Sequence, residues 1–193
     1  MLDAAGVEPA LAQLVDNVKA DGVRLNAARE GYSRAACIWR VDSTNIQLVK
    51  FRQGITVKFP VRYESLFNEA YSPTERLATI AHELGHLYCG HVGTISEHRW
   101  PDRRSLDLDL KGREAESVAR VVFGRMFPGV DMPPYRDMPT GNDLLDLSKL
   151  SFKLVMDSAT WILQDTLGPR RHTAEKDYDK PRSTWPAIDE PSH

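Results

Sequence analysis

The sequence predicts an α+β fold in which a small antiparallel sheet packs with a helical core. Three segments rich in β-branched and aromatic residues follow one another at 35–41, 45–51 and 55–61. Turn-like residues separate them, and segments with helical periodicity flank them. The 193 residues are enough for one domain with a substantial core. We expect that domain to span residues 1–168, and the polar, proline-containing residues 169–193 to form a flexible tail.

Helical signals of different strength surround the predicted sheet. Apolar residues at helical spacing predict a first helix over 9–29. Pro60 indicates that the last strand ends there or lies at an edge. After the sheet, we expect a loop over 92–111 and further amphipathic helices over 112–127 and 143–167.

The helix between the sheet and this loop has the clearest boundaries. Ser72 is a candidate N-cap, Pro73 occupies the first helical position, and Glu75 completes a capping box. Apolar residues then follow at i, i+3, i+4 and i+7, which defines one buried face. Gly90 can end the helix, and Gly85 leaves one side low, where a substrate or a strand can approach.

Composition and charge narrow the functional classes. The formal net charge is −2, which favours neither nucleic acid nor an anionic membrane as a direct partner. Cys37 and Cys89 form no disulfide framework and no CxxC pair, and we expect both to be buried structural residues. No segment approaches the about 18 apolar residues that cross a bilayer, and the N-terminal segment lacks the pattern of a secretory signal. A cytoplasmic location is therefore expected.

The sequence HELGH, from His82 to His86, is the strongest functional signal. On a helix, positions i and i+4 lie one turn apart on the same side, so both imidazoles can bind one zinc ion. Glu83 lies one step round the helix, where its carboxylate can act as general base toward a metal-activated water. The alternative is a core helix that carries two histidines with ordinary partners.

A catalytic zinc site takes three protein ligands and keeps one position open. His91 is a candidate third ligand, but it falls one residue short of the spacing typical of metzincins, and a helix C-terminus also favours a histidine. The loop that follows offers further candidates, which also suit a solvated loop: His98, Asp102, Asp107 and Asp109.

The next predicted helix offers a better third ligand. Glu114 lies one turn before Val118 at the border of the apolar stripe, from which its side chain can reach inward. Glu116 lies one turn before Arg120, where a surface ion pair is a natural partner. We therefore favour Glu114 as the ligand and keep Glu116 as the alternative.

These motifs resemble those of the ImmA/IrrE-like zinc metallopeptidases. The resemblance rests on ATIAHELGHLYCGH, preceded by strand-rich sequence, and on REAESVA in the next helix, and it covers about residues 10–165. It implies a zinc ion held by His82, His86 and Glu114, with Glu83 as catalytic glutamate. It also implies hydrolysis of a peptide bond in a cytoplasmic regulatory, repressor-like protein. Ser117 departs from the family's usual ExEA…FA pattern, which leaves the choice between Glu114 and Glu116 open.

Two functions follow from these observations. The first is a zinc endopeptidase, which the intact Glu83 favours. The second is a non-catalytic zinc scaffold that binds a transcriptional regulator. Trp100, Arg103 and Arg104 in the loop could shape a substrate cleft. Alternatively, the loop is solvated and its charged residues form surface ion pairs. Tyr88 could stabilise an oxyanion, but its place on the apolar stripe favours a core position.

Overall fold

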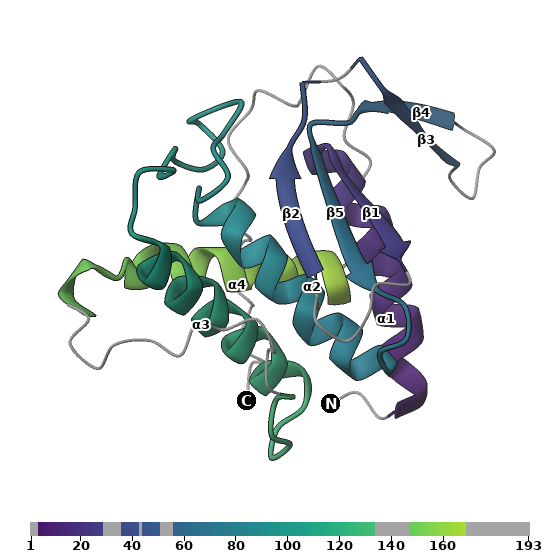
Figure 1. The fold of residues 1–193 in the computed structure, drawn as a ribbon. Coiled ribbons are helices and arrows are strands. Elements are labelled where there is room, and N and C mark those ends of the chain that lie inside the picture. The colour runs from purple at the N-terminus through teal and green to yellow at the C-terminus, as the bar shows by residue number, and fades with distance from the viewer. Residues whose placement is uncertain (1–3, 29–35, 43, 51–55, 134–146, 169–193) are drawn as a thin grey trace, which may run out of the picture.

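The computed structural model describes residues 4–28, 36–42, 44–50, 56–133 and 147–168. These residues contain four α-helices and two small sheets, which confirms the predicted α+β class (Figure 1). The chain order is α1 (Ala4–Asn17), η1 (Val18–Asp21), β1 (Val23–Ala28), β2 (Ala36–Arg40), β3 (Ile46–Lys50), β4 (Thr56–Pro60), β5 (Tyr63–Asn68), α2 (Pro73–Tyr88), α3 (Leu108–Met126), η2 (Leu147–Lys149) and α4 (Phe152–Leu167).

The main sheet is mixed, not antiparallel as the sequence suggested. Its order is β1-β5-β2, with β1 parallel and β2 antiparallel to β5, while β3 and β4 form a separate antiparallel pair. The predicted helix over 9–29 was wrong in its second half, because the short η1 turn ends at Gly22, whose φ of 77° stops helical propagation. Strand β5, which the sequence analysis missed, alternates buried and partly buried side chains over most of its length.

Helix α2 forms as its sequence predicts. The Ser72 hydroxyl accepts a hydrogen bond from the Glu75 backbone, and the Glu75 carboxylate accepts one from the Ser72 backbone, so the capping box is confirmed. Leu77, Ile80 and Leu84 are almost fully buried in the core cluster. The helix ends at Tyr88 with Cys89 as its C-cap, and Gly90 follows with a φ of 82°. The HELGH motif therefore lies on a helix whose position is fixed at both ends.

Helices α3 and α4 differ from their predicted bounds. The α3 helix begins four residues early, because Asp107 accepts hydrogen bonds from the first-turn backbone as its N-cap. The α4 helix begins after the N-cap Ser151, and the first residues of the predicted helix lie outside the described part of the chain. The predicted tail over 169–193 lies outside it too. None of the helices within the described ranges is long and apolar enough to cross a membrane.

Close contact between α2 and α3 occurs at Gly85. A Cβ atom at this position would lie 3.0 Å from Ala115 Cα and 3.2 Å from Val118 Cβ. The low side of α2, expected to admit a substrate or a strand, is thus filled by α3. Helices α2 and α3 therefore pack against each other (Figure 1). This packing brings Glu116 of α3 next to His82 of α2.

Candidate metal and catalytic site

The α2 helix places its two motif histidines side by side, as the sequence predicts. The rings of His82 and His86 meet edge to face with centroids 5.0 Å apart. His82 and Glu83 are only 3% and 4% exposed, whereas His86 is half-buried. The spacing of the motif therefore produces a compact group of titratable side chains at the boundary between core and surface.

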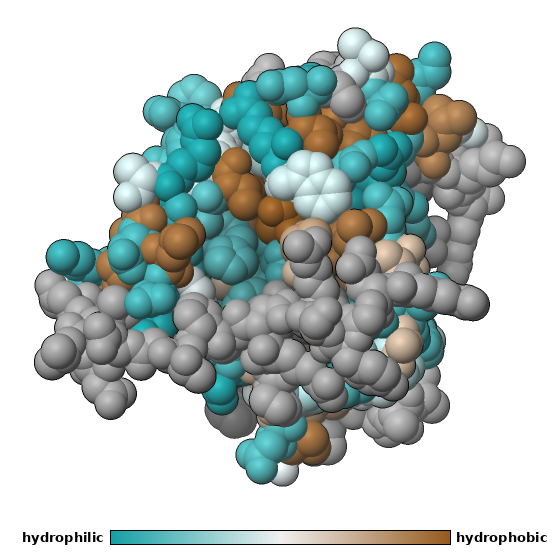
Figure 2. Space-filling view, viewed as in Figure 1, coloured by the Kyte–Doolittle hydropathy of each residue, from teal (hydrophilic) through white to brown (hydrophobic). Residues whose placement is uncertain are grey.

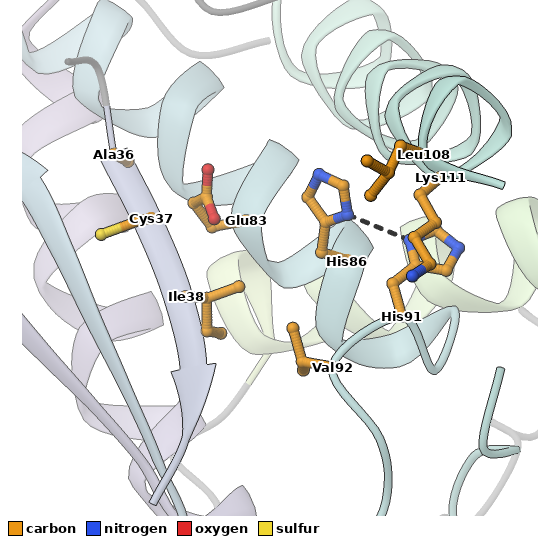
Figure 3. Close-up of a pocket in the computed structure, with 9 residues that line it drawn as sticks. All are labelled: Ala36, Cys37, Ile38, Glu83, His86, His91, Val92, Leu108 and Lys111. Atoms are coloured by element: carbon orange, nitrogen blue, oxygen red, sulfur yellow. Dashed lines mark hydrogen bonds between the residues drawn. The ribbon is translucent and has the colours of Figure 1, made fainter. Parts of the chain in front are cut away.

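A pocket of about 330 Å³ opens beside this group. Glu83 and His86 form its wall on α2, and strand β2 forms the opposite wall (Figure 3). On the face shown in Figure 2, hydrophobic and hydrophilic side chains surround a hollow over this region. The remaining lining is mixed, with apolar side chains and one cation: Ala36, Cys37, Ile38, His91, Val92, Leu108 and Lys111. The motif glutamate therefore faces a space that a ligand can enter.

Glu116 is the α3 carboxylate that approaches His82. Its Oε2 lies 3.5 Å from His82 Nδ1, and its Oε1 pairs with Arg120 at 2.8 Å. The predicted pair with Arg120 is confirmed, but the Glu116 side chain is only 9% exposed and points to the site. Apart from the long contact with His82, Oε2 has no hydrogen-bond partner in the described part of the chain. Burial raises the pKa of Glu116, yet His82 and Arg120 outweigh it, so the pKa is lowered.

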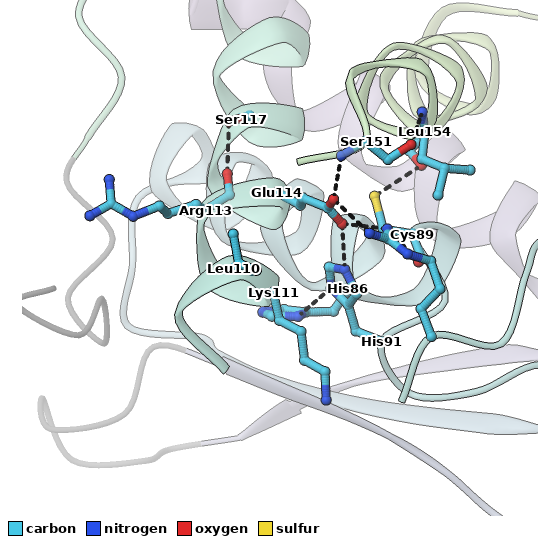
Figure 4. Close-up of polar contacts among 12 residues, drawn as sticks. His86, Cys89, His91, Leu110, Lys111, Arg113, Glu114, Ser117, Ser151 and Leu154 are labelled. Atoms are coloured by element: carbon cyan, nitrogen blue, oxygen red, sulfur yellow. Dashed lines mark hydrogen bonds and ion pairs between the residues drawn. The ribbon is translucent and has the colours of Figure 1, made fainter. Parts of the chain in front are cut away.

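Glu114 lies in a different environment, fully buried among hydrogen-bond donors (Figure 4). Arg103 binds both carboxylate oxygens, at 2.6 and 2.9 Å. His91 Nε2 lies 2.8 Å from Oε2, and the Ser151 backbone N–H donates to Oε1 at 2.7 Å. Burial raises the pKa of Glu114, but these donors outweigh it and lower the pKa to about 2. Each oxygen thus accepts two hydrogen bonds, which fills the lone pairs of an ionised carboxylate.

His91 connects Glu114 with the HELGH motif. Its Nδ1 lies 3.0 Å from Nδ1 of His86, and the two ring planes are inclined by 70°. Burial, with the neighbouring His82, His91 and Lys111, lowers the pKa of His86 to about 2. Burial also lowers the pKa of His91, although Glu114 opposes this effect. Both imidazoles are therefore neutral near neutral pH, so each ring carries one N–H hydrogen and one nitrogen lone pair.

Cys89, His91 and Glu114 form a buried group that could hold a metal ion, with ligand atoms within 4.8 Å of one another. Two features weaken this group as a metal site. Burial raises the pKa of the Cys89 thiol to about 12 in the metal-free protein, so a metal ion would have to displace the thiol proton on binding. Arg103 already neutralises Glu114 and occupies its oxygens. Cys89 is buried as predicted, and Cys37 is half-buried beside the pocket.

The segment between α2 and α3 is anchored rather than solvated. A buried ion pair joins Arg99 to Asp21, and Tyr88 donates a hydrogen bond to the same carboxylate at 2.7 Å. Trp100 is 1% exposed and packs edge to face on Tyr88, so Tyr88 is a core residue, as expected. Arg103 binds the buried Glu114, and its charge alone did not predict this partner.

Other candidate ligands in this segment have different positions. His98 is exposed on the loop, and Asp107 caps α3. Asp102 forms a surface ion pair with Arg104, as expected for a solvated loop.

Comparison with known proteins identifies no relative: no family model, curated protein or solved structure matches this chain. The resemblance to ImmA/IrrE-like peptidases thus rests on the motifs themselves.

Within the described part of the chain, His82, His86 and Glu116 do not bring three ligand atoms within 4.8 Å of one another, but His82 and Glu116 alone have a spacing that zinc ligands share. Two imidazoles and one carboxylate are a donor set typical of catalytic zinc. Two donors of one tetrahedral shell, each about 2.0–2.1 Å from the metal, lie about 3.3 Å apart. The 3.5 Å between His82 Nδ1 and Glu116 Oε2 is close to this value. A buried carboxylate oxygen without a close donor is also the group that a cation would stabilise.

Proposed function

We propose that this protein is a zinc-dependent endopeptidase whose metal is held by His82, His86 and a carboxylate of α3. The observation that carries the proposal is that Glu83 and His86 line one pocket opposite strand β2. Glu116 is the better third donor, because its Oε2 lies beside His82, whereas Arg103, His91 and Ser151 use the oxygens of Glu114.

Each residue then has a defined task. The bound zinc would supply Lewis-acid chemistry, which polarises a peptide carbonyl and activates a water molecule. Glu83 accepts the proton of the attacking water and returns it to the amine of the leaving fragment. Its position in the pocket wall gives its carboxylate access to a bound peptide. A structural scaffold would need no such carboxylate at this place.

Strand β2 supports a peptide as the substrate. Within the described ranges it pairs on one side with β5, and Ala36, Cys37 and Ile38 line the pocket. An extended segment can bind along such a strand through backbone hydrogen bonds, while its side chains enter the pocket. The motif resemblance extends this to a cytoplasmic regulatory protein, cleaved at an extended or locally unfolded segment. The formal net charge of −2 gives no reason to expect direct contact with nucleic acid.

A comparison of protein termini tests this function. Cells that produce the native protein should contain one or a few new N-termini that are absent with Glu83→Gln. The variant keeps the shape of the side chain but loses the proton acceptor, so hydrolysis should fall by about 10²–10⁴-fold. Its zinc content should equal that of the native protein. Equal cleavage by both forms would refute the proposed role of Glu83, and broad digestion of unrelated proteins would refute the regulatory substrate.

A further inference from the structure

We infer that His91 is a positioning residue that, together with Glu114, fixes the tautomer of the metal-binding His86. The inference rests on the proposed metal site, because it concerns which nitrogen of His86 remains available to zinc. Its evidence is a chain of three side chains: His86, His91 and Glu114 (Figures 3 and 4). The side chains of His91 and Glu114 are 1% and 0% exposed, so water does not compete for these hydrogen bonds.

Glu114 determines which group donates and which accepts in each of these hydrogen bonds. Two hydrogen bonds from Arg103 and one from the Ser151 backbone hold its carboxylate in the ionised form, which only accepts. The hydrogen at the 2.8 Å contact must therefore lie on His91 Nε2. Because Arg103 balances the charge of Glu114, His91 can remain neutral, and a neutral imidazole that carries its hydrogen on Nε2 has a bare Nδ1.

The bare Nδ1 of His91 determines the state of His86. The 3.0 Å contact joins Nδ1 of both rings, and a hydrogen bond there needs one donor and one acceptor. Since His91 is the acceptor, His86 carries its hydrogen on Nδ1. Its Nε2, on the other side of the ring, then holds the lone pair that binds a metal. Metal-bound histidines commonly donate their second N–H in this way, which orients the ring and raises its basicity.

Two other roles for His91 fit the geometry less well. As a third zinc ligand beside His86, it would lose the hydrogen bond between the two Nδ1 atoms, which lie at the ordinary hydrogen-bond length of 3.0 Å. A separate metal bound by His91, Cys89 and Glu114 would replace the hydrogen bond between His91 and Glu114 and compete with the three hydrogen bonds from Arg103 and Ser151.

Three variants test the inference. His91→Ala removes the acceptor for His86, whereas His91→Gln retains a carbonyl oxygen for His86 and an amide N–H for Glu114. His98→Ala removes an exposed histidine of the same loop as the matched control. Nitrogen-15 NMR of the metal-free proteins reports the tautomer of His86, and competition with a chromophoric chelator reports zinc affinity.

We expect His86 to carry its hydrogen on Nδ1 in the native protein and in His91→Gln, and to lose this preference in His91→Ala. Zinc affinity should fall about 10–100-fold in His91→Ala, return to within a few-fold of native in His91→Gln, and stay unchanged in His98→Ala. A His86 tautomer that does not respond to His91→Ala overturns the inference. Loss of zinc in both His91 variants, with a cobalt spectrum that shows one fewer imidazole, would make His91 a ligand and overturn it also. Failure of the native protein to bind zinc refutes the proposed function, while the tautomer measurement still decides the role of His91.

Discussion

Substitution of Glu114 by glutamine should destabilise the protein, because charged and polar donors hold the buried carboxylate in its ionised form. The donors around this carboxylate lower its pKa from the ordinary 4.5 to about 2. At 1.36 kcal/mol per pKa unit, this shift corresponds to about 3 kcal/mol of stability that depends on the charge. Glu114→Gln removes the charge and leaves Arg103, which is 19% exposed, without its anion. We expect the free energy of unfolding at pH 7 to fall by about 3 kcal/mol, or Tm by about 6–12 °C.

The pH dependence identifies the cause of this loss. A carboxylate with a lowered folded-state pKa stabilises the protein fully above its unfolded pKa, and loses the effect as pH falls toward its folded pKa. The difference between native protein and Glu114→Gln should therefore be constant above about pH 5.5 and shrink between pH 4.5 and about 2. Urea denaturation with a metal chelator present measures it, and Glu97→Gln, at an exposed position, is the control. A loss below about 1 kcal/mol, or one that persists at low pH, would contradict this account.

Three further predictions concern other parts of the structure. Gly85→Ala should lower the free energy of unfolding by about 1–2 kcal/mol, because the new methyl group meets the α3 backbone at 3.0 Å and this outweighs the gain in helix propensity; a more stable variant would show that α3 can move away. In a Cys37→Ser background, Cys89 should not react with a thiol reagent until the protein unfolds, because burial raises its pKa to about 12; rapid labelling of the native protein would contradict this. Arg99→Met should cost about 3–5 kcal/mol, because it removes the cation that faces the buried Asp21; a loss within about 0.5 kcal/mol would show that this ion pair is not needed.

Local signals predicted α2 well, and non-local pairing explains the failures elsewhere. Ser72 and Glu75 define the start of α2 within four residues, so no distant contact is needed to recognise it. The segment Val23–Ala28 has a helix-compatible composition, and it becomes a strand because it pairs in parallel with β5. That partner lies about forty residues further along the chain, which periodicity within one segment cannot reveal. The unpredicted β5 strand is also what makes the sheet mixed.

In the candidate site, too, local signals predicted some features, and tertiary packing determined the others. The i, i+4 spacing of His82 and His86 predicts two adjacent imidazoles, and the structure contains them. Both Glu114 and Glu116 are buried, so their distance from the apolar stripe of α3 could not separate their roles. The separation depends on how α3 is rotated against Gly85 and on the position of Arg103. Both are products of tertiary packing.

We propose that His82, His86 and Glu116 hold one zinc ion beside Glu83. An anomalous-scattering map from zinc-loaded crystals, recorded at the zinc absorption edge, would locate this ion. We predict one peak per chain, within about 2.0–2.2 Å of a nitrogen of each histidine and an oxygen of Glu116. A peak bound by Cys89, His91 and Glu114, a peak bound by Glu114 in place of Glu116, or no peak at these histidines would refute this set of ligands.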